Sequence, residues 1–408
     1  MLFALLFISY SLIYMTKNCY SAAMAAIVDG GIMTKSETGL IAAMFYIIYA
    51  PFQIVGGIAA DKLSPAKLIV FGSLGAALCN LLVYIFSGNY VAMIIIWSLN
   101  AVVQFGIWPS IFKIVVSELC EEHRTRGVFF INFSVTAGLV LSYGTALFIK
   151  DWRMNFLLSA ITLFVIAAVF FFIYRALSSS MLPYERTKEI GSTGDKKRHT
   201  GALRIVIASG VPLIMIVSVT QGLLNIGLKG LVPVMLMESY DSIGPTVANA
   251  LNIILILASP VGLFLGRAPF LKKLNYPMAL AALLSVSVPM LIIMTYVGRA
   301  HVALIMTALV ILAVAISAMA IYASYVSKSF EWLGVSATLA GLFNCMVALG
   351  IVLANYVFTK IAESYGWNTT VIIWLVLACL SLALSLIATP LWKRFLKKRE
   401  KMQSAVSE

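Results

Sequence analysis

Long apolar runs alternate with short polar segments along the whole chain. Several runs exceed the roughly 20 residues that cross a bilayer as an α-helix, and the two-residue alternation of a membrane β-barrel is absent. The pattern therefore predicts an all-α integral membrane protein with twelve transmembrane helices. The expected spans lie near residues 3–28, 39–60, 67–87, 91–119, 127–149, 154–177, 207–237, 244–266, 275–297, 301–327, 335–361 and 368–392.

The longest polar stretch separates the sixth span from the seventh and predicts two six-helix halves. We expect an N-terminal half over residues 1–177, a linker over 178–203, a C-terminal half over 204–392 and a basic tail over 393–408. The first apolar run starts at Met1 without a basic segment before it and is too long for the core of a signal peptide. We therefore expect it to remain as the first span.

Composition agrees with a membrane protein, because only 11% of the 408 residues are charged and 62% are hydrophobic. Soluble domains have roughly 25% charged residues. The net charge of +13 is concentrated in the loops after even-numbered spans, in the linker and in the tail. By the positive-inside rule, both termini and the linker face the cytoplasm, in a plasma (inner) membrane. The charge then reports topology, so we expect a bilayer and no nucleic acid as partner, and a monomer.

A lysine inside the first span is the leading candidate for a functional residue. A charge near the bilayer centre costs at least a few kcal/mol, so such residues usually have a function. Helical spacing puts Tyr10, Tyr14, Lys17 and Ser21 on one side of this span. The stripe predicts an anion site. The alternative is a lysine that snorkels or has a structural ion-pair partner.

The seventh span carries a second polar stripe, in which Gln221, Asn225 and Lys229 recur every four residues. Spans one and seven each open one half, so their lysines suggest two cations facing a central cavity. The alternative for this stripe is hydrogen bonding between helices, with the lysine reaching the outer interface. A third lysine, Lys113, lies near the cytoplasmic end of span four, where we expect it to snorkel or meet a carboxylate near Asp61.

Catalytic and energy-coupling motifs are missing from the sequence. No Asp or Glu lies near the middle of a span, which favours anion exchange or facilitated movement over proton coupling. No phosphate-binding GxxxxGK[ST] loop is present. The five cysteines and three histidines form no metal-ligand or catalytic set, so we expect no enzyme, metal or cofactor.

The segment GGIAADKLSPAK after span two resembles the G-x-x-x-D-[RK] loop of the major facilitator superfamily, with Asp61 and Lys62 as its charged pair. Within that superfamily, the chain is similar to the organophosphate:phosphate antiporters, which include glycerol-3-phosphate and hexose-phosphate transporters. The similarity is carried by YMTKNCYSAAM in span one, NAVVQFGIWPSIFKIV in span four, RGVFFINFSVTAG in span five and SATLAGLFNCMVALG in span eleven.

The resemblance implies the major facilitator fold and a site between its halves. The family's helix-one arginine falls on Lys17, and its helix-seven arginine falls on Asn225 when the prolines are aligned at Pro233. The family's helix-five histidine falls on Val135, next to Asn132. A lysine keeps the charge of an arginine but loses its two-pronged geometry.

We therefore expect a transporter that moves a small organic anion, a sugar phosphate, glycerol phosphate or sugar acid, by alternating access. The alternative is a membrane sensor of sugar phosphate that has the same fold and does not transport. Lys17 and Lys229 would attract the anion. The residues expected to hydrogen-bond it are Tyr10, Tyr14, Asn132, Gln221, Asn225 and Asn344, and those expected to gate the cytoplasmic side are Asp61, Lys62, Lys113, Arg126 and Gly57.

Overall fold

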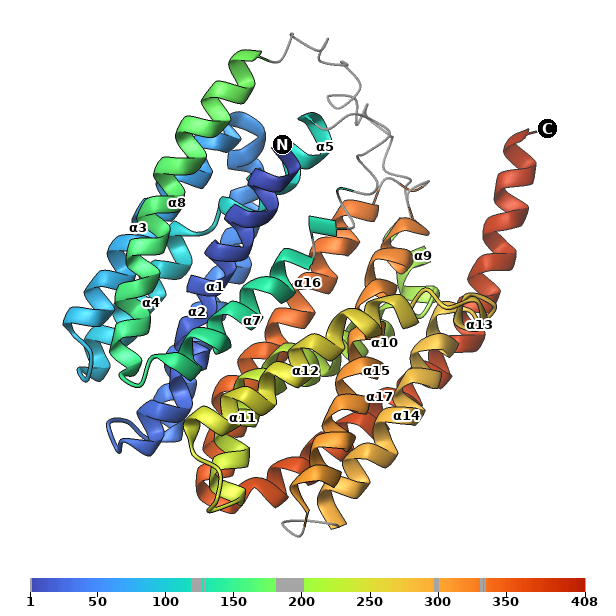
Figure 1. Ribbon diagram of the computed structural model, residues 1–408. Coiled ribbons are helices and arrows are strands. Elements are labelled where there is room, and N and C mark those ends of the chain that lie inside the picture. The colour runs from blue at the N-terminus through green and yellow to red at the C-terminus, as the bar shows by residue number, and fades with distance from the viewer. Residues whose placement is uncertain are drawn as a thin grey trace. The chain divides into compact units, whose positions relative to one another are not determined.

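Helices joined by turns and short irregular connections make up the part of the chain that the computed structural model describes (Figure 1). That part comprises residues 2–118, 127, 130–131, 133–180, 202–296, 301–330, 333 and 335–407. A few side chains inside the helices, including those of Asp61 and Lys62, are also outside the description.

The first six predicted spans correspond to helices whose ends lie within a few residues of the expected positions. Span four differs, because it is broken between two helices. The turn precedes Pro109, which lacks the N–H that a continuous helix would use at that position. The helices are α1 (Leu2–Asp29), α2 (Lys35–Lys62), α3 (Pro65–Ile85), α4 (Tyr90–Val103), α5 (Ile107–Glu118), α7 (Phe133–Phe148) and α8 (Trp152–Ser180).

The last six predicted spans also coincide with helical segments, but spans seven and eleven each contain a π-helical turn. Such turns often occur at functional sites. The segments are α9 (Ala202–Ala208), α10 (Val211–Gly222), η2 (Leu223–Gly227), α11 (Leu228–Ser239), α12 (Pro245–Leu265), α13 (Pro269–Lys272), α14 (Tyr276–Tyr296), α15 (Val302–Lys328), α16 (Ser336–Val352), η4 (Leu353–Phe358) and α17 (Thr359–Ser407).

Among the described residues, eight helices are long and apolar enough to cross a membrane. Counting Val211–Asn225 with Lys229–Ser239 as one broken span makes nine. One of the eight, Gly341–Glu400, is 60 residues long. At 1.5 Å per residue its length is roughly 90 Å, which is far more than one membrane crossing needs. Gly366 interrupts this run with a φ of 80°, so it contains spans eleven and twelve.

Helix α2 begins at Lys35 because a capping box precedes it. The Thr34 hydroxyl accepts a hydrogen bond from the Glu37 N–H at 3.2 Å, and the Glu37 carboxylate accepts one from the Thr34 N–H at 2.8 Å. These two bonds satisfy two backbone donors that a helix N-terminus leaves unpaired. The start of α2 is therefore fixed by the local sequence.

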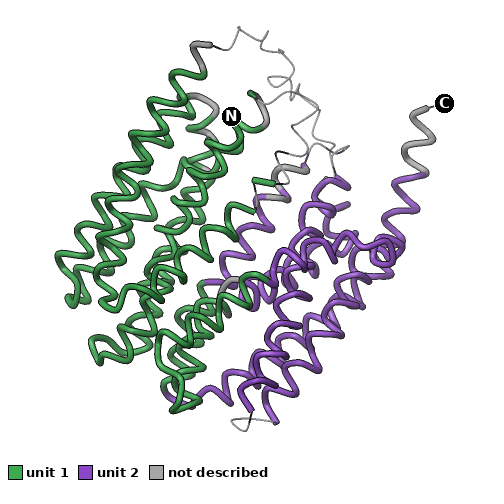
Figure 2. Tube along the Cα trace, viewed as in Figure 1, with its two compact units in different colours: residues 1–185, 229–257, 352–363 green, residues 186–228, 258–351, 364–408 purple. Residues whose placement is uncertain are grey.

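The chain forms two compact units, which Figure 2 shows in different colours. Unit 1 comprises residues 1–185, 229–257 and 352–363, and unit 2 comprises residues 186–228, 258–351 and 364–408. Segments of spans seven, eight and eleven thus group by contact with the N-terminal helices. The division of the chain into two six-helix halves, residues 1–177 and 204–392, stays a prediction.

Both units carry large apolar side chains on their surfaces. In unit 1, Phe71, Phe148 and Phe172 are each more than two-thirds exposed, whereas Leu6 and Ile114 are fully buried in the core. Soluble monomers rarely expose so many large hydrophobic side chains. A hydrocarbon environment removes the cost of this exposure, so these surfaces face lipid.

Unit 2 holds α10 and α16 together through two glycines that pack reciprocally. A Cβ on Gly222 would lie 2.1 Å from the Val347 carbonyl oxygen, and a Cβ on Gly350 would lie 2.0 Å from that of Val219. Two backbones can approach this closely only where side chains are absent. Small residues therefore determine how these two spans cross.

We predict that Gly350→Ala lowers the thermal unfolding midpoint of the purified protein. The added methyl group overpacks the crossing of α10 and α16, which typically costs about 1–3 kcal/mol. Gly341→Ala is the matched control in the same helix, because a Cβ there meets nothing within 4 Å. Equal midpoints for the two variants would contradict the close crossing.

Candidate functional site

The Lys17 ammonium lies among aromatic rings contributed by α1 and α2, all within unit 1. Its Nζ is 3.5 Å from the ring centroid of Tyr49, 5.4 Å from that of Phe45, 5.5 Å from that of Tyr14 and 5.9 Å from that of Tyr46. All four distances are within the reach of a cation–π interaction. We call Tyr14, Phe45, Tyr46 and Tyr49 the aromatic cage.

The cage follows from helical spacing on two adjacent helices. Tyr14 precedes Lys17 by three residues on α1, and Phe45 and Tyr49 are four residues apart on α2, so each pair shares a helix face. The Phe45 and Tyr49 rings also stack, with centroids 5.5 Å apart. Sequence reasoning included Tyr14 but missed the other three. The cluster FYIIY in span two was the available signal.

The described residues give the Lys17 ammonium no carboxylate and no hydrogen-bond acceptor. Its described contacts are the four ring faces, and the side chain is half-buried. An ammonium has three N–H donors, and ring faces compensate only part of the cost of removing it from water. The cage therefore holds a cation that can still donate hydrogen bonds to an anion.

Tyr10, predicted on the same stripe, lies deeper in the core. Its ring is 6% exposed and packs 4.9 Å from Trp108 of α5 and 5.8 Å from Tyr14, measured between centroids. Tyr10 thus supports the position of Tyr14. A direct contact of Tyr10 with a ligand stays a prediction.

Lys229 is the second residue of α11, in the first turn after the π-helical segment, and it is 8% exposed. Its backbone carbonyl oxygen accepts two hydrogen bonds, from the Tyr143 hydroxyl at 3.1 Å and from the Asn252 amide at 2.7 Å. Tyr143 belongs to α7 and Asn252 to α12. Sequence reasoning missed both residues, because neither forms part of a recognisable motif.

The remaining predicted ligands fall into two groups. Gln221, Asn225 and Asn344 belong to unit 2, where Gln221 is buried, Asn344 is exposed and the Asn225 Oδ1 accepts a hydrogen bond from Ser317 at 3.1 Å. Asn132 lies outside the described residues. Lys17 and Tyr14 are thus in contact within unit 1, whereas Gln221, Asn225 and Asn344 belong to unit 2.

The predicted gating residues are only partly described. Lys113 of α5 donates a hydrogen bond from Nζ to the Ala60 carbonyl at 2.6 Å, near the end of α2, where a cation is favoured. Gly57 is half-buried, and a Cβ there would meet nothing within 4 Å. The side chains of Asp61, Lys62 and Arg126 are not described, so their gating role stays a prediction.

At the opposite end of α2, polar contacts join it to segments from the second half of the sequence within unit 1. Lys35 forms an ion pair with Glu238 of α11 at 2.8 Å, and Ser36 donates hydrogen bonds to Glu363. Gly39 packs so closely that a Cβ would lie 2.0 Å from the Asn355 carbonyl oxygen. We call these contacts, made by Lys35, Ser36 and Gly39, the α2 latch.

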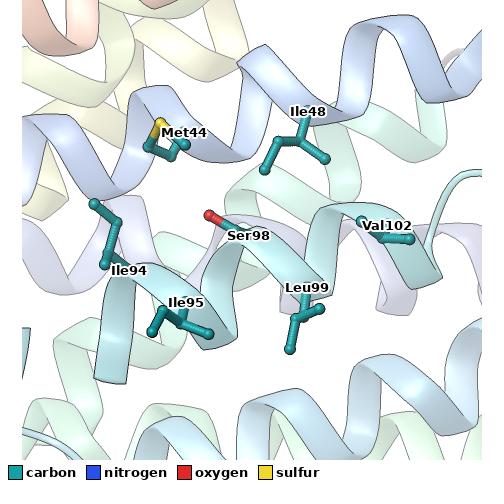
Figure 3. Close-up of a pocket in the computed structure, with 7 residues that line it drawn as sticks. All are labelled: Met44, Ile48, Ile94, Ile95, Ser98, Leu99 and Val102. Atoms are coloured by element: carbon teal, nitrogen blue, oxygen red, sulfur yellow. The ribbon is translucent and has the colours of Figure 1, made fainter. Parts of the chain in front are cut away.

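A groove of about 340 Å³ lies between α2 and α4 (Figure 3). It offers a single polar side chain, Ser98, and several of its lining residues are aliphatic. Such a groove cannot compensate the dehydration of an anion. Its lining residues are Met44, Ile48, Ile94, Ile95, Ser98, Leu99 and Val102.

We predict that Tyr49→Leu lowers the free energy of unfolding of the unliganded protein by about 0.5–2 kcal/mol, because the contact of the ring with Lys17 is lost. The thermal unfolding midpoint should fall accordingly. Tyr49→Phe, which keeps the ring face, should retain most of the stability. The same Tyr49→Leu change in a Lys17→Met background should cost less. An identical cost in both backgrounds would show that the ring does not stabilise the ammonium.

The sequence model described as the Major Facilitator Superfamily matches residues 6–354. The chain is 34% identical over 102 residues to the membrane sensor protein UhpC of Salmonella typhimurium, covering 25% of this chain and 23% of that protein. It is 24% identical over 123 residues to a "Probable hexose phosphate transport protein" of Chlamydia pneumoniae, covering 30% and 27%. These matches thus span about a quarter of the length of the curated relatives.

Solved structures with the same fold cover nearly the whole chain. A bacterial homolog of the human lysosomal transporter Spinster has a TM-score of 0.78 at 14% identity, with 97% of each chain covered. The nucleoside transporter NupG has a TM-score of 0.73 at 15% identity, covering 96% of this chain and 99% of its own. The family match over most of the sequence and the shared fold show that this chain belongs to the major facilitator superfamily.

Proposed function

We propose that this multi-pass membrane protein is a secondary transporter that moves a small organic anion across the plasma membrane by alternating access. The observation that carries the proposal is the Lys17 ammonium, held in a membrane-spanning helix by aromatic rings and by no described carboxylate. A transporter needs an attractive site that also releases its ligand. A cation whose contacts among the described residues are ring faces meets both needs.

The energetics favour exchange of the ring contact for an anion. A cation–π contact contributes about 0.5–2 kcal/mol, whereas hydrogen bonds to charged groups contribute about 1.5–3 kcal/mol each. A phosphate or carboxylate oxygen therefore competes successfully with the Tyr49 face for the ammonium. The gain is partly offset by loss of the ring contact, so release remains accessible.

Lys229 is the proposed second cation, with Asn225, Gln221 and Asn344 as further hydrogen-bonding groups. Lysine is a compact point charge without the two-pronged geometry by which arginine recognises phosphate. Sugar phosphates, glycerol phosphate and sugar acids are therefore all candidate substrates. The chlamydial relatives are named as probable hexose phosphate transport proteins, so a hexose phosphate is the first ligand to test.

Movement of the anion requires the site to open to each side in turn. The α2 latch joins α2 to α11 and to Asn355 and Glu363, and these contacts would have to break during the cycle. The Lys35–Glu238 ion pair is partly buried, with side-chain exposures of 18% and 26%, so opening it costs more than the about 0–1 kcal/mol of a fully exposed pair. With both termini placed in the cytoplasm by the positive-inside rule, the latch lies at the outer end of α2.

A membrane sensor is the second candidate function. The observation that favours it is the similarity to the membrane sensor proteins UhpC of Salmonella typhimurium and Escherichia coli, at 34% and 31% identity over about a quarter of the chain. A sensor would use the same cation to detect the anion and would not release it on the other side.

We predict that Lys17→Gln weakens binding of glucose 6-phosphate by about ten- to hundredfold, because one charge-assisted hydrogen bond is lost. Isothermal titration calorimetry on purified protein measures the affinity, and gluconate tests the sugar-acid alternative. Lys272→Gln is the control, because Lys272 is exposed at the C-terminal end of α13. If Lys17→Gln and Lys229→Gln bind as tightly as the parent, the two-lysine site is wrong.

Counterflow distinguishes the transporter from the sensor. Proteoliposomes loaded with unlabelled hexose phosphate should accumulate labelled hexose phosphate transiently if the protein exchanges its ligand. Lys17→Gln vesicles serve as the inactive control. A parent protein that binds the ligand in calorimetry but gives no counterflow would favour the sensor.

A further inference from the structure

Two of the backbone carbonyls that lie four residues before a proline accept hydrogen bonds from side chains of other helices. The Lys229 carbonyl precedes Pro233, and the Phe105 carbonyl precedes Pro109. An α-helix would pair each carbonyl with the N–H of the residue four positions later, but proline has no N–H. The proline therefore removes one helical donor from each carbonyl, and a side chain of another helix can take that place.

Side chains from neighbouring helices provide these donors in both places. The Gln53 amide of α2 donates to the Phe105 carbonyl at 3.1 Å. At Lys229, the Asn252 amide and the Tyr143 hydroxyl donate together, at 2.7 and 3.1 Å. The same arrangement thus occurs twice, and the Lys229 carbonyl receives the stronger version, with two donors from two helices.

The donors at Lys229 are themselves rigidly placed. Tyr143 is 1% exposed and belongs to a buried cluster with Ala22 of α1 and Ile256 of α12. Asn252 is fully buried, and its Oδ1 has no hydrogen-bond partner among the described residues. An unsatisfied buried acceptor costs about 1–3 kcal/mol. Burial of the Asn252 Oδ1 therefore costs stability. The Nδ2 group of the same side chain offsets this cost by donating to the Lys229 carbonyl.

We propose that Tyr143 and Asn252 are positioning residues that orient Lys229 for anion binding by holding its backbone carbonyl, which cannot pair with an N–H of Pro233. The inference rests on the proposed function, in which Lys229 is a ligand of the anion. The carbonyl belongs to the peptide unit of Lys229 itself, so rotating that unit changes the direction of the side chain. Donors from α7 and α12 fix the rotation from two sides.

Loss of one donor leaves the carbonyl satisfied but free to tilt toward the other. Loss of both removes two donors from a buried carbonyl, which costs stability as well as orientation. The informative single variant is therefore Tyr143→Phe, which removes only a hydroxyl. Tyr322→Phe is the matched control, because the Tyr322 hydroxyl also donates to a backbone carbonyl, that of Gly266 at 3.2 Å.

We predict that Tyr143→Phe weakens calorimetric binding of glucose 6-phosphate about fivefold, the equivalent of one neutral hydrogen bond. Tyr322→Phe should bind within twofold of the parent. The decisive rescue is Pro233→Ala, which restores the helical N–H to the Lys229 carbonyl. In the Pro233→Ala background, Tyr143→Phe should have no further effect on affinity. An undiminished fivefold loss there would overturn the proposal, because a merely structural role of Tyr143 does not depend on residue 233.

A second readout needs no ligand. With the five native cysteines replaced by alanine, Lys229→Cys reports the direction of the side chain through its rate of reaction with a small methanethiosulfonate reagent. Tyr143→Phe should change this rate several-fold, and Tyr322→Phe should leave it unchanged. A rate unaffected by Tyr143→Phe overturns the positioning role. If the parent binds no anion while the rate still changes, the proposed function fails and the orientation of residue 229 by Tyr143 stands.

Discussion

The cost of keeping an ammonium group inside a membrane-spanning helix constrains the rest of the structure. A carboxylate partner would lower this cost and would also neutralise the charge that an anion needs. Lys17 instead faces the rings of Tyr14, Phe45, Tyr46 and Tyr49, which stabilise a cation without carrying a charge. The packing of α1 against α2 is thus tied to the chemistry of the candidate site.

Irregular backbone forms a second common element. Spans four, seven and eleven contain turns, π-helical segments or closely packed glycines, and side chains of neighbouring helices donate to the backbone at Phe105 and Lys229. The Lys229 carbonyl accepts hydrogen bonds from α7 and α12, and the backbone at Asn355 packs against Gly39 of α2. These contacts join early and late parts of the sequence at a few polar or glycine positions. A transporter that works by alternating access must break such contacts in one conformation and form them again in another.

The positions of the spans could be predicted from the sequence to within a few residues, because hydrocarbon thickness sets the length of each apolar run. Pro51, Pro109, Pro233 and Pro260 indicated from the sequence that their spans can bend or break, and spans four and seven do break near Pro109 and Pro233. Pro51 and Pro260 lie inside unbroken helices, so the prolines alone did not show which spans would break. The donors to the carbonyls four residues before Pro109 and Pro233 come from other helices, as Gln53, Tyr143 and Asn252.

The candidate site was only partly visible in the sequence. Helical spacing identified Tyr14 and Lys17 as neighbours, and the structure places Lys17 over the ring of Tyr14. The same spacing could not show that Tyr10 packs against Trp108, or that α2 supplies the nearest ring, Tyr49. Those facts depend on how helices rotate against each other. The second lysine was evident from its stripe, whereas the donors that hold its backbone were not.

A structure of the protein with a bound hexose phosphate would show whether Lys17 is the anion ligand. We expect a phosphate oxygen within hydrogen-bonding distance of the Lys17 Nζ, and this nitrogen displaced from its position 3.5 Å from the Tyr49 ring centroid. A bound phosphate elsewhere, with Lys17 still seated on Tyr49, would contradict the assignment of Lys17 as the anion ligand.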